Sequence, residues 1–240
     1  MSMVKNKFTN CISGFTLAEV LITLVVVGVI AAMTIPTLIN TYRKSVVESK
    51  LKKSFSVLSN AVKRATADYG DISVWEFDNL ENFLNKYMLP YISNVKGQIS
   101  AYHTWNKCKL ELADGTFWEI SNPSNFNIRQ YDGLNHPYIM VKVDINGDAK
   151  PNNAGYDQFV FYILPYSAGI FNTGDHDIAH DVLQPGVYYD GYNISKNELL
   201  NNSLRKCSDS CNSSGNCRYY CVALIAQNGW KIPNDYPLNL

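Results

Sequence analysis

One carboxylate, Glu19, lies near the start of a long apolar stretch of the sequence. From Phe15 to Ile39 the chain has 25 residues without Lys, Arg or Asp. As a helix this stretch would be about 37 Å long, enough to span a bilayer core of about 30 Å. An unpaired carboxylate inside a membrane costs at least a few kcal/mol, so an acid at this place predicts a function and a cationic partner.

A second group of candidate residues offers oxygen ligands at alternate positions. Asp144, Asn146 and Asp148 follow the spacing of calcium loops, and Asp157 could close a site from further along the chain. The segment is not an EF-hand, because it lacks the glycine at the sixth position and the glutamate at the twelfth. The alternative is a turn in which the side chains bond to their own backbone.

The sequence contains no recognisable catalytic constellation. His176 and His180 are four residues apart among aspartates, but they form no HExxH motif, and a solvated polar loop is the favoured interpretation. The four histidines are not arranged with a serine or cysteine elbow, and no glycine-rich phosphate loop is present. We therefore expect a protein that is not an enzyme and has no cofactor, apart from the candidate calcium ion.

Four of the six cysteines fall within fifteen residues near the C-terminus, the crowding expected of thiols that are oxidised in pairs. This favours an extracytoplasmic domain. Zinc is the weaker alternative, because the CxxxC pairs lack the pattern of a zinc knuckle. Cys108 either joins this group, leaves another thiol over, or stays buried and reduced. The disulfide candidates, whose pairing remains open, are Cys108, Cys207, Cys211, Cys217 and Cys221.

Composition and charge are ordinary for one modest soluble domain with one membrane segment. Lys plus Arg and Asp plus Glu each number 21, so no global field draws the protein to nucleic acid or to an anionic membrane. Basic residues on the predicted stem could bind DNA, but a solvated face paired with acids is favoured. We expect no nucleic-acid partner.

The apolar stretch continues as an amphipathic helix. Apolar residues recur every three or four positions from Tyr42 to Ala65, and Gly70 is a typical helix stop. Unbroken from Phe15 to Tyr69, the helix would be about 80 Å long. Pro36 lacks an amide hydrogen and obstructs a carbonyl, so we expect a kink or local melting there, although prolines are also tolerated in membrane helices.

The rest of the chain predicts a head built mainly of strands. Apolar residues in 75–88 recur at helical spacing, which predicts a second, short helix. In 108–121 apolar residues alternate with other residues on both sides of an Asp-Gly turn, which predicts a β-hairpin. Residues 138–145 and 156–164 are predicted strands, and 222–230 a final strand or helix. The expected fold class is α+β: a long N-terminal transmembrane and stem helix packed against a C-terminal antiparallel β-sheet head.

The segment "GFTLAEVLITLVVVGVIAAMTIP" resembles the N-terminus of type IV pilins and of type II secretion pseudopilins. In these proteins a short basic leader ends in Gly, Phe follows, and Glu lies five residues beyond the Gly. A secretory signal peptide would have a shorter apolar core. The resemblance divides the chain into a leader (1–14), a transmembrane helix (15–39), a stem (40–70) and a globular head (71–240). It rests on Gly14, Phe15, Thr16, Leu17, Glu19 and Pro36.

The resemblance implies that a prepilin peptidase cuts between Gly14 and Phe15 and methylates the new amine of Phe15. It also implies that other pilin or pseudopilin subunits and an inner-membrane assembly platform are partners. Glu19 would then pair with the Phe15 amine of a neighbouring subunit, so that the two charges neutralise each other in an apolar core. The alternative is that Glu19 is solvated at the membrane interface or protonated.

The expected function is that of a pilin-like structural subunit, a minor pilin or a pseudopilin, in the inner membrane. Lys5 and Lys7 hold the N-terminus in the cytoplasm, which places the head in the periplasm or, after assembly, outside the cell. Basic residues after the span oppose this orientation, but the cysteines favour it. The alternatives are a signal-anchored extracytoplasmic binding protein or enzyme, and a minor pilin that binds DNA or a surface.

Overall fold

The computed structural model divides the chain into two compact units, Met1–Arg43 and Lys44–Leu240, each of which is described by itself. The predicted leader (apart from Gly14), Cys11, His176 and His180 lie outside the described residues. The structure describes residues 14–77, 79–96, 100–102, 107–121, 128–129, 135–136, 138–164, 182–186, 194–201, 205–211 and 217–240.

The first unit contains the beginning of helix α1 (Leu17–Tyr69), which is 53 residues long. By length and composition α1 is the described helix that could cross a membrane. It is helical on both sides of Pro36, so the helix does not melt there, and the predicted kink stays a prediction. Threonine hydroxyls in this unit bond to carbonyls of the same helix, for example Thr34 Oγ1 to Ile30 O at 2.9 Å. Such bonds satisfy polar side chains where no water is present.

In the second unit, the remaining part of α1 buries one face. The sequence periodicity placed Tyr42 on the apolar face of the stem. Tyr42 is instead exposed and belongs to the first unit. The helix ends at Tyr69 because Gly70 takes a left-handed conformation, with φ of 83°, and its N–H donates to Thr66 O at 3.0 Å. This confirms the predicted stop. The buried residues are Val47, Leu51, Ser54, Leu58, Ser59, Ala61, Val62 and Ala65.

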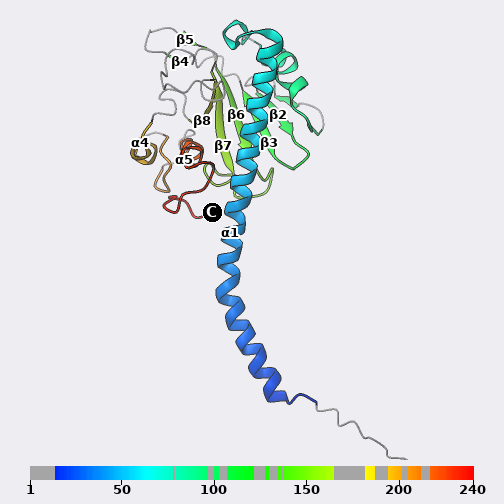
Figure 1. The fold of residues 1–240 in the computed structure, drawn as a ribbon, viewed down its shortest axis with the longest axis vertical. Helices are drawn as coiled ribbons and strands as arrows, with labels where there is room; N and C mark the ends of the chain where they lie inside the picture. Colours follow the sequence, from blue (N-terminus) through cyan, green and yellow to red (C-terminus); the bar gives the residue numbers. More distant parts are fainter. Residues whose placement is uncertain are drawn as a thin grey trace, which may run out of the picture. The chain divides into compact units, whose positions relative to one another are not determined.

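The head contains a six-stranded antiparallel sheet in the order β1-β2-β3-β6-β7-β8 (Figure 1). The predicted hairpin is confirmed: β2 and β3 pair so that Leu110 lies opposite Trp118. The two predicted strands that follow are confirmed as β6 and β7. The strands are β1 (Ser100–Tyr102), β2 (Lys107–Glu111), β3 (Phe117–Ser121), β6 (Ile139–Asp144), β7 (Gln158–Ile163) and β8 (Leu183–Pro185), with β4 (Ile128–Arg129) and β5 (Asn135–His136) in a separate pair.

One face of the sheet packs against the stem part of α1, as the α+β prediction required. Inward residues such as Trp118, Ile120 and Phe161 are fully buried in the same apolar cluster as Leu51 and Leu58 of the helix. The sheet therefore covers the apolar face of the stem, which could not remain exposed to water. A smaller cluster, Val160, Tyr162 and Leu164, also includes the partly buried Tyr138, Met140 and Tyr219.

The segment after Gly70 differs from the single helix predicted for residues 75–88. Trp75 lies outside any helix: its Nε1 donates to Gly70 O at 3.1 Å, and its ring stacks on Tyr87 at 4.5 Å. Asn79 then caps a new helix by accepting from the N–H of Glu81 at 2.9 Å. The predicted aromatic stripe is nevertheless core. The elements are η1 (Ile72–Val74), α2 (Leu80–Phe83), the π-helical η2 (Leu84–Met88) and η3 (Leu89–Tyr91).

Two short helices complete the described head. The apolar segment predicted as a strand or helix is helix α5 (Cys221–Gln227), which is buried along most of its length. Helix α4 (Lys196–Asn201) was not predicted. Its start carries a signal that the sequence does show: Ser195 and Glu198 form a capping box, with the Ser195 N–H donating to Glu198 Oε2 at 2.8 Å.

Candidate functional site

The residues that begin α1 are bonded to one another. The N–H and the hydroxyl of Thr16 both donate to Glu19 Oε2 at 2.8 Å, and the Glu19 N–H donates to Thr16 Oγ1 at 3.3 Å. This is a capping box, which satisfies two of the amide hydrogens that a helix start leaves free. The sequence letters T-x-x-E are the signature of such a cap, which was not among the features predicted from the sequence.

This arrangement fixes where the Glu19 carboxylate lies in the single subunit. Both bonds from Thr16 end on the same oxygen, Oε2. Phe15, directly before the cap, is 88% exposed, and a side chain built at Gly14 would meet nothing within 4 Å. The predicted cleavage junction is therefore open, and the acid lies one helical turn beyond it.

Two aspartates of the candidate calcium loop, Asp144 and Asp157, accept hydrogen bonds from the protein itself. Asp144 accepts from the Asn146 N–H at 3.2 Å and from Gln158 Nε2 at 2.8 Å. Both oxygens of Asp157 accept backbone N–H groups at 2.7 Å. The bond between Asp144 and the Asn146 N–H, two residues on, is that of an Asx turn, whereas Asp157 accepts from the N–H groups of Asn152 and Asn153, which precede it.

Asp148 forms an ion pair with Lys109, with 3.3 Å between Asp148 Oδ1 and Lys109 Nζ. Burial raises the pKa of Asp144, although hydrogen bonds from Gln158 and Asn146 oppose the shift. No group of three or more His, Cys, Asp or Glu that could hold a metal is found in the described part of the chain. One side-chain oxygen of the loop, Asn146 Oδ1, is buried without a hydrogen-bond partner among the described residues, and calcium binding stays a prediction.

Two family models match the chain. Residues 9–35 match the prokaryotic N-terminal methylation motif, which contains the capping box and the Gly14–Phe15 junction. Residues 37–240 match a family of unknown function (DUF6613). The chain belongs to the DUF6613 family.

The methylation motif shows that this DUF6613 member is a type IV pilin-like protein with a membrane anchor. The motif implies processing by prepilin peptidase and assembly with other pilin subunits. The comparison with curated proteins and the comparison with solved structures gave no match. The DUF6613 match begins at Thr37 and so contains the whole head.

The cysteines of the DUF6613 region form two nested disulfides. Cys207 pairs with Cys221, and Cys211 pairs with Cys217. Cys108, a disulfide candidate from sequence, is instead a free and buried thiol in β2. Burial raises its pKa to about 11, so it is protonated and unreactive at neutral pH.

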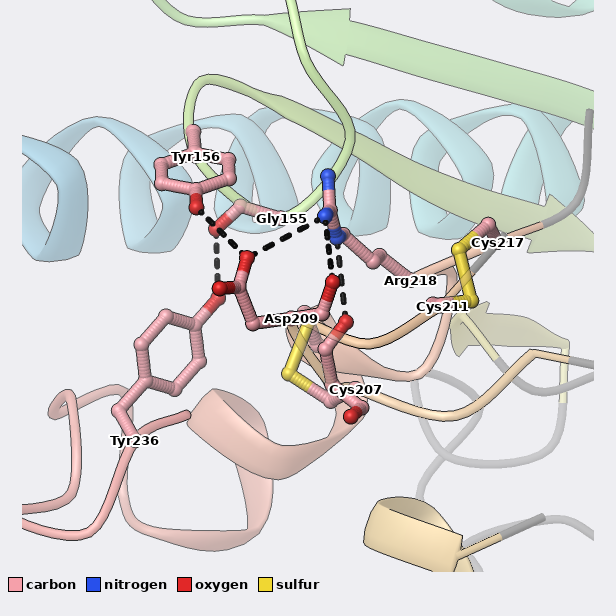
Figure 2. The surroundings of a disulfide bond; sticks show 10 residues. Gly155, Tyr156, Cys207, Asp209, Cys211, Cys217, Arg218 and Tyr236 are labelled. Atoms are coloured by element: carbon pink, nitrogen blue, oxygen red, sulfur yellow. Dashed lines mark hydrogen bonds and ion pairs between the residues drawn. A yellow bond between two sulfur atoms is a disulfide. The ribbon is translucent and has the colours of Figure 1, made fainter. Parts of the chain in front are cut away.

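Arg218 holds the disulfide loop together (Figure 2). Its guanidinium donates to Ser208 O and to Asp209 O, both at 3.2 Å, and lies 5.4 Å from the centre of the Tyr156 ring. The Tyr156 hydroxyl in turn donates to Asp209 at 3.3 Å. The loop between β6 and β7 is therefore fastened to the disulfide loop by contacts that the sequence does not reveal.

Gly155 allows the C-terminal segment to approach the same loop. Tyr236 donates its hydroxyl to Gly155 O at 2.6 Å (Figure 2). A Cβ at Gly155 would lie 2.7 Å from Leu238 Cδ1 and 2.8 Å from Cys221 Sγ. With φ of 82°, the position also needs the conformational freedom of glycine.

Three polar stem residues bind the head and were not singled out from the sequence. Glu48 accepts from the Ile232 N–H at 2.9 Å. Lys50 donates to Ile145 O at 2.5 Å, and Lys53 pairs with Asp114 at 2.6 Å. Part of the basic face that the sequence assigned to solvent therefore fastens the turns of the sheet to α1.

Asp114, in the turn between β2 and β3, is a carboxyl with a strongly lowered pKa. Burial acts to raise its pKa, but hydrogen bonds from Lys53 and Thr116 outweigh burial and hold the pKa at about 2. Thr116 donates its backbone N–H to this carboxylate at 3.1 Å. The charged form of Asp114 is therefore the form that the fold favours.

Proposed function

We propose that this protein is a structural subunit, a minor pilin or a pseudopilin, of a type IV pilus or a type II secretion pseudopilus. The observation that carries the proposal is the position of Glu19 on the first turn of α1, directly after an open Gly14–Phe15 junction inside a matched methylation motif. A head of about 170 residues is large for the main component of a shaft, which favours a minor subunit.

In this proposal Glu19 has a different partner before and after assembly. In the single subunit its Oε2 caps the helix through Thr16. Cleavage leaves this cap intact, because it removes nothing beyond Gly14, and it creates an amine on Phe15. In a filament the amine of a neighbouring subunit would approach the carboxylate, and two charges that are each costly in an apolar core would neutralise each other.

The head is proposed to lie in the periplasm, or outside the cell once the subunit is assembled, with an inner-membrane platform as assembly partner. Its two disulfides support this, because disulfides persist in oxidising compartments. A structural role is proposed for the head rather than a catalytic one. The polar groups described above act in caps, turns and contacts between loops and the stem.

The first test is the mass of the mature N-terminus. We expect loss of residues 1–14 and one added methyl group on Phe15. A Gly14→Val variant should stay at full length, because the leaders of the proteins that this segment resembles end in Gly. Since a side chain at Gly14 meets nothing within 4 Å, the variant should keep the fold and thermal unfolding of the wild-type head.

The alternative function, a signal-anchored binding protein or enzyme, predicts the opposite result. Such a protein would stay in the membrane unprocessed and would keep its activity in a strain without prepilin peptidase. Finding the full-length, unmethylated chain in cells that process other prepilins would overturn our proposal. A minor pilin that binds DNA or a surface would pass the processing test and show measurable affinity of the assembled subunit for that ligand.

A further inference from the structure

Charge is unevenly distributed along the stem in the second unit and the segment that follows it. Between Lys44 and Arg64 the one acidic residue is Glu48, whereas no Lys or Arg occurs from Ala65 to Asn85. The chain as a whole is balanced, with 21 residues of each sign, so the separation is local. The basic residues are Lys44, Lys50, Lys52, Lys53, Lys63 and Arg64, and the described acids that follow them are Asp68, Asp71, Glu76 and Glu81.

The acidic end also exposes apolar side chains. Among the described residues of 44–240, Tyr69 and Val74 are the large apolar side chains that are exposed, at 43% and 69%. Single apolar residues on a surface are ordinary, but these two lie together with exposed Asp71 and Glu76 where α1 ends. We call Tyr69, Asp71, Val74 and Glu76 the distal patch.

Contacts hold the distal patch in one place. Lys86 lies 5.7 Å from the centre of the Tyr69 ring and 3.8 Å from the Glu76 carboxylate. Asp71 caps η1 by accepting from the Ser73 N–H at 2.9 Å. A Cβ at Gly70 would lie 4.0 Å from the Val74 side chain. The patch is therefore a fixed surface and not a set of independent side chains.

Among the lysines of this stretch, Lys52 is exposed and available to another molecule. Lys50 and Lys53 are committed to the head, through Ile145 O and Asp114. Lys52 lies between them in sequence and is exposed, and its side chain has no partner among the described residues. Around it the exposed face of the helix carries small or polar residues that allow close approach: Ser45, Ser49, Ser56 and Asn60.

We propose that the distal patch of one copy docks on the exposed stem face around Lys52 of a second copy. The inference deepens the proposed function and rests on it. The acidic residues of the patch meet a basic surface, and Tyr69 and Val74 pack against short side chains of the partner's stem. Because the two surfaces differ, the contact is head-to-tail, and it builds an open filament when the rotation between copies does not close into a ring.

The sequence sets the axial offset between the two copies. Lys52 and Tyr69 are 17 positions apart on α1, which corresponds to about 26 Å along the helix. Two copies in this contact are therefore displaced along the stem by about that length. A row of copies joined in this way keeps a free distal patch at one end and a free stem face around Lys52 at the other, so further copies can add.

Cysteine cross-linking of the full chain in its native host tests the contact. In a Lys52→Cys/Val74→Cys variant we expect oxidation to give a ladder of multimers in a non-reducing gel. In the control, Lys52→Cys/Asn197→Cys, the second cysteine lies on the exposed surface of α4, and we expect no ladder. A band that stops at the dimer, or a cross-link exclusively to another protein, would overturn the proposal.

Charge reversal provides the second arm. Lys52→Glu and Glu76→Lys should each lower incorporation into filaments about tenfold, and the two together should restore it. Unchanged incorporation in the single variants, or no restoration in the double variant, would contradict docking. A chain that is processed and assembled but forms no ladder removes the docking inference alone. A chain that is never processed removes the proposed function itself.

Discussion

The two units of the chain satisfy their polar groups over different distances. In the first unit, bonds such as Thr16 to Glu19 and Thr41 to Thr37 O span three or four residues of one helix. In the second, Glu48 of α1 bonds to the Ile232 N–H, 184 residues away. The apolar side chains differ in the same way, exposed in the first unit and buried in the second.

This contrast shows what each unit needs from outside. The described first unit supplies its own polar bonds but no cover for its apolar surface, which suits a membrane or a bundle of other helices. The second unit supplies both its own polar hydrogen bonds and the cover for its apolar side chains. A substitution in the first should therefore act on anchoring and assembly, and the same substitution in the second on folding.

The largest expected effect comes from Glu19 in the first unit. Glu19→Ala should lower filament incorporation at least about tenfold, because the subunit loses the charge that pairs with a neighbour's amine. Cleavage after Gly14 should continue. Glu19→Gln is the matched control, since it keeps a capping oxygen but not the charge. Normal incorporation of the alanine variant, measured by immunoblot of sheared filaments, would remove the pairing idea.

The same change, leucine to alanine, at one position of α1 in each unit tests the difference between the units most directly. Leu58 is fully buried, whereas Leu24 is 64% exposed. Leu58→Ala should lower the free energy of unfolding of the head by about 2–5 kcal/mol. Leu24→Ala should change it by less than about 0.5 kcal/mol. Chemical denaturation of the full chain in detergent measures both, and equal effects would contradict the division into units.

The disulfides should stabilise the head by different amounts. Cys207 and Cys221 close a loop with a sequence separation of 14, against 6 for Cys211 and Cys217. Replacing the outer pair by serine should cost about 3 kcal/mol, and replacing the inner pair should cost less, because a longer loop restrains the unfolded chain more. Thermal unfolding of the two double variants gives the order, and a reversed order would refute this account.

The smallest expected effect is the pH dependence from Asp114. Its pKa in the folded head, about 2, is below the usual 3.8, so the folded state favours the charged carboxylate. The stabilisation of the folded head by the Asp114 carboxylate is complete above about pH 4 and is lost as the pH falls toward 2. Asp114→Asn should cost about 1 kcal/mol or less near neutral pH, because the carboxylate is partly exposed. The variant and the wild type should converge in unfolding free energy near pH 2.

Local patterns predicted most of the elements correctly. The stop at Gly70, the hairpin about Asp114 and two further strands follow from residues close together in sequence. The prediction failed where a distant contact overrides local spacing. Trp75 has helical spacing with Phe83, yet its ring stacks on Tyr87 and its Nε1 binds Gly70 O, which places it outside the helix.

The candidate site residues also include some whose role follows from local sequence and some whose partners only the fold reveals. The junction at Gly14, Phe15 and Glu19 can be predicted from sequence because its chemistry depends on neighbouring residues. The oxygen spacing of the candidate calcium loop is equally local, but the partners of its aspartates are Gln158, Lys109 and backbone amides of the folded loop. A pattern of ligands does not reveal which of them the protein already uses.

The sequence by itself determined the anchor and the α+β class and predicted the processing junction, since these depend on hydrophobic length, a short motif and residue periodicity. Tertiary structure alone decided the pairing of the cysteines, the free thiol of Cys108, the roles of Glu48, Lys50 and Lys53, and the distal patch. These depend on residues brought together from distant parts of the chain. Local patterns do not contain that information, because packing of the sheet against the stem sets which side chains meet.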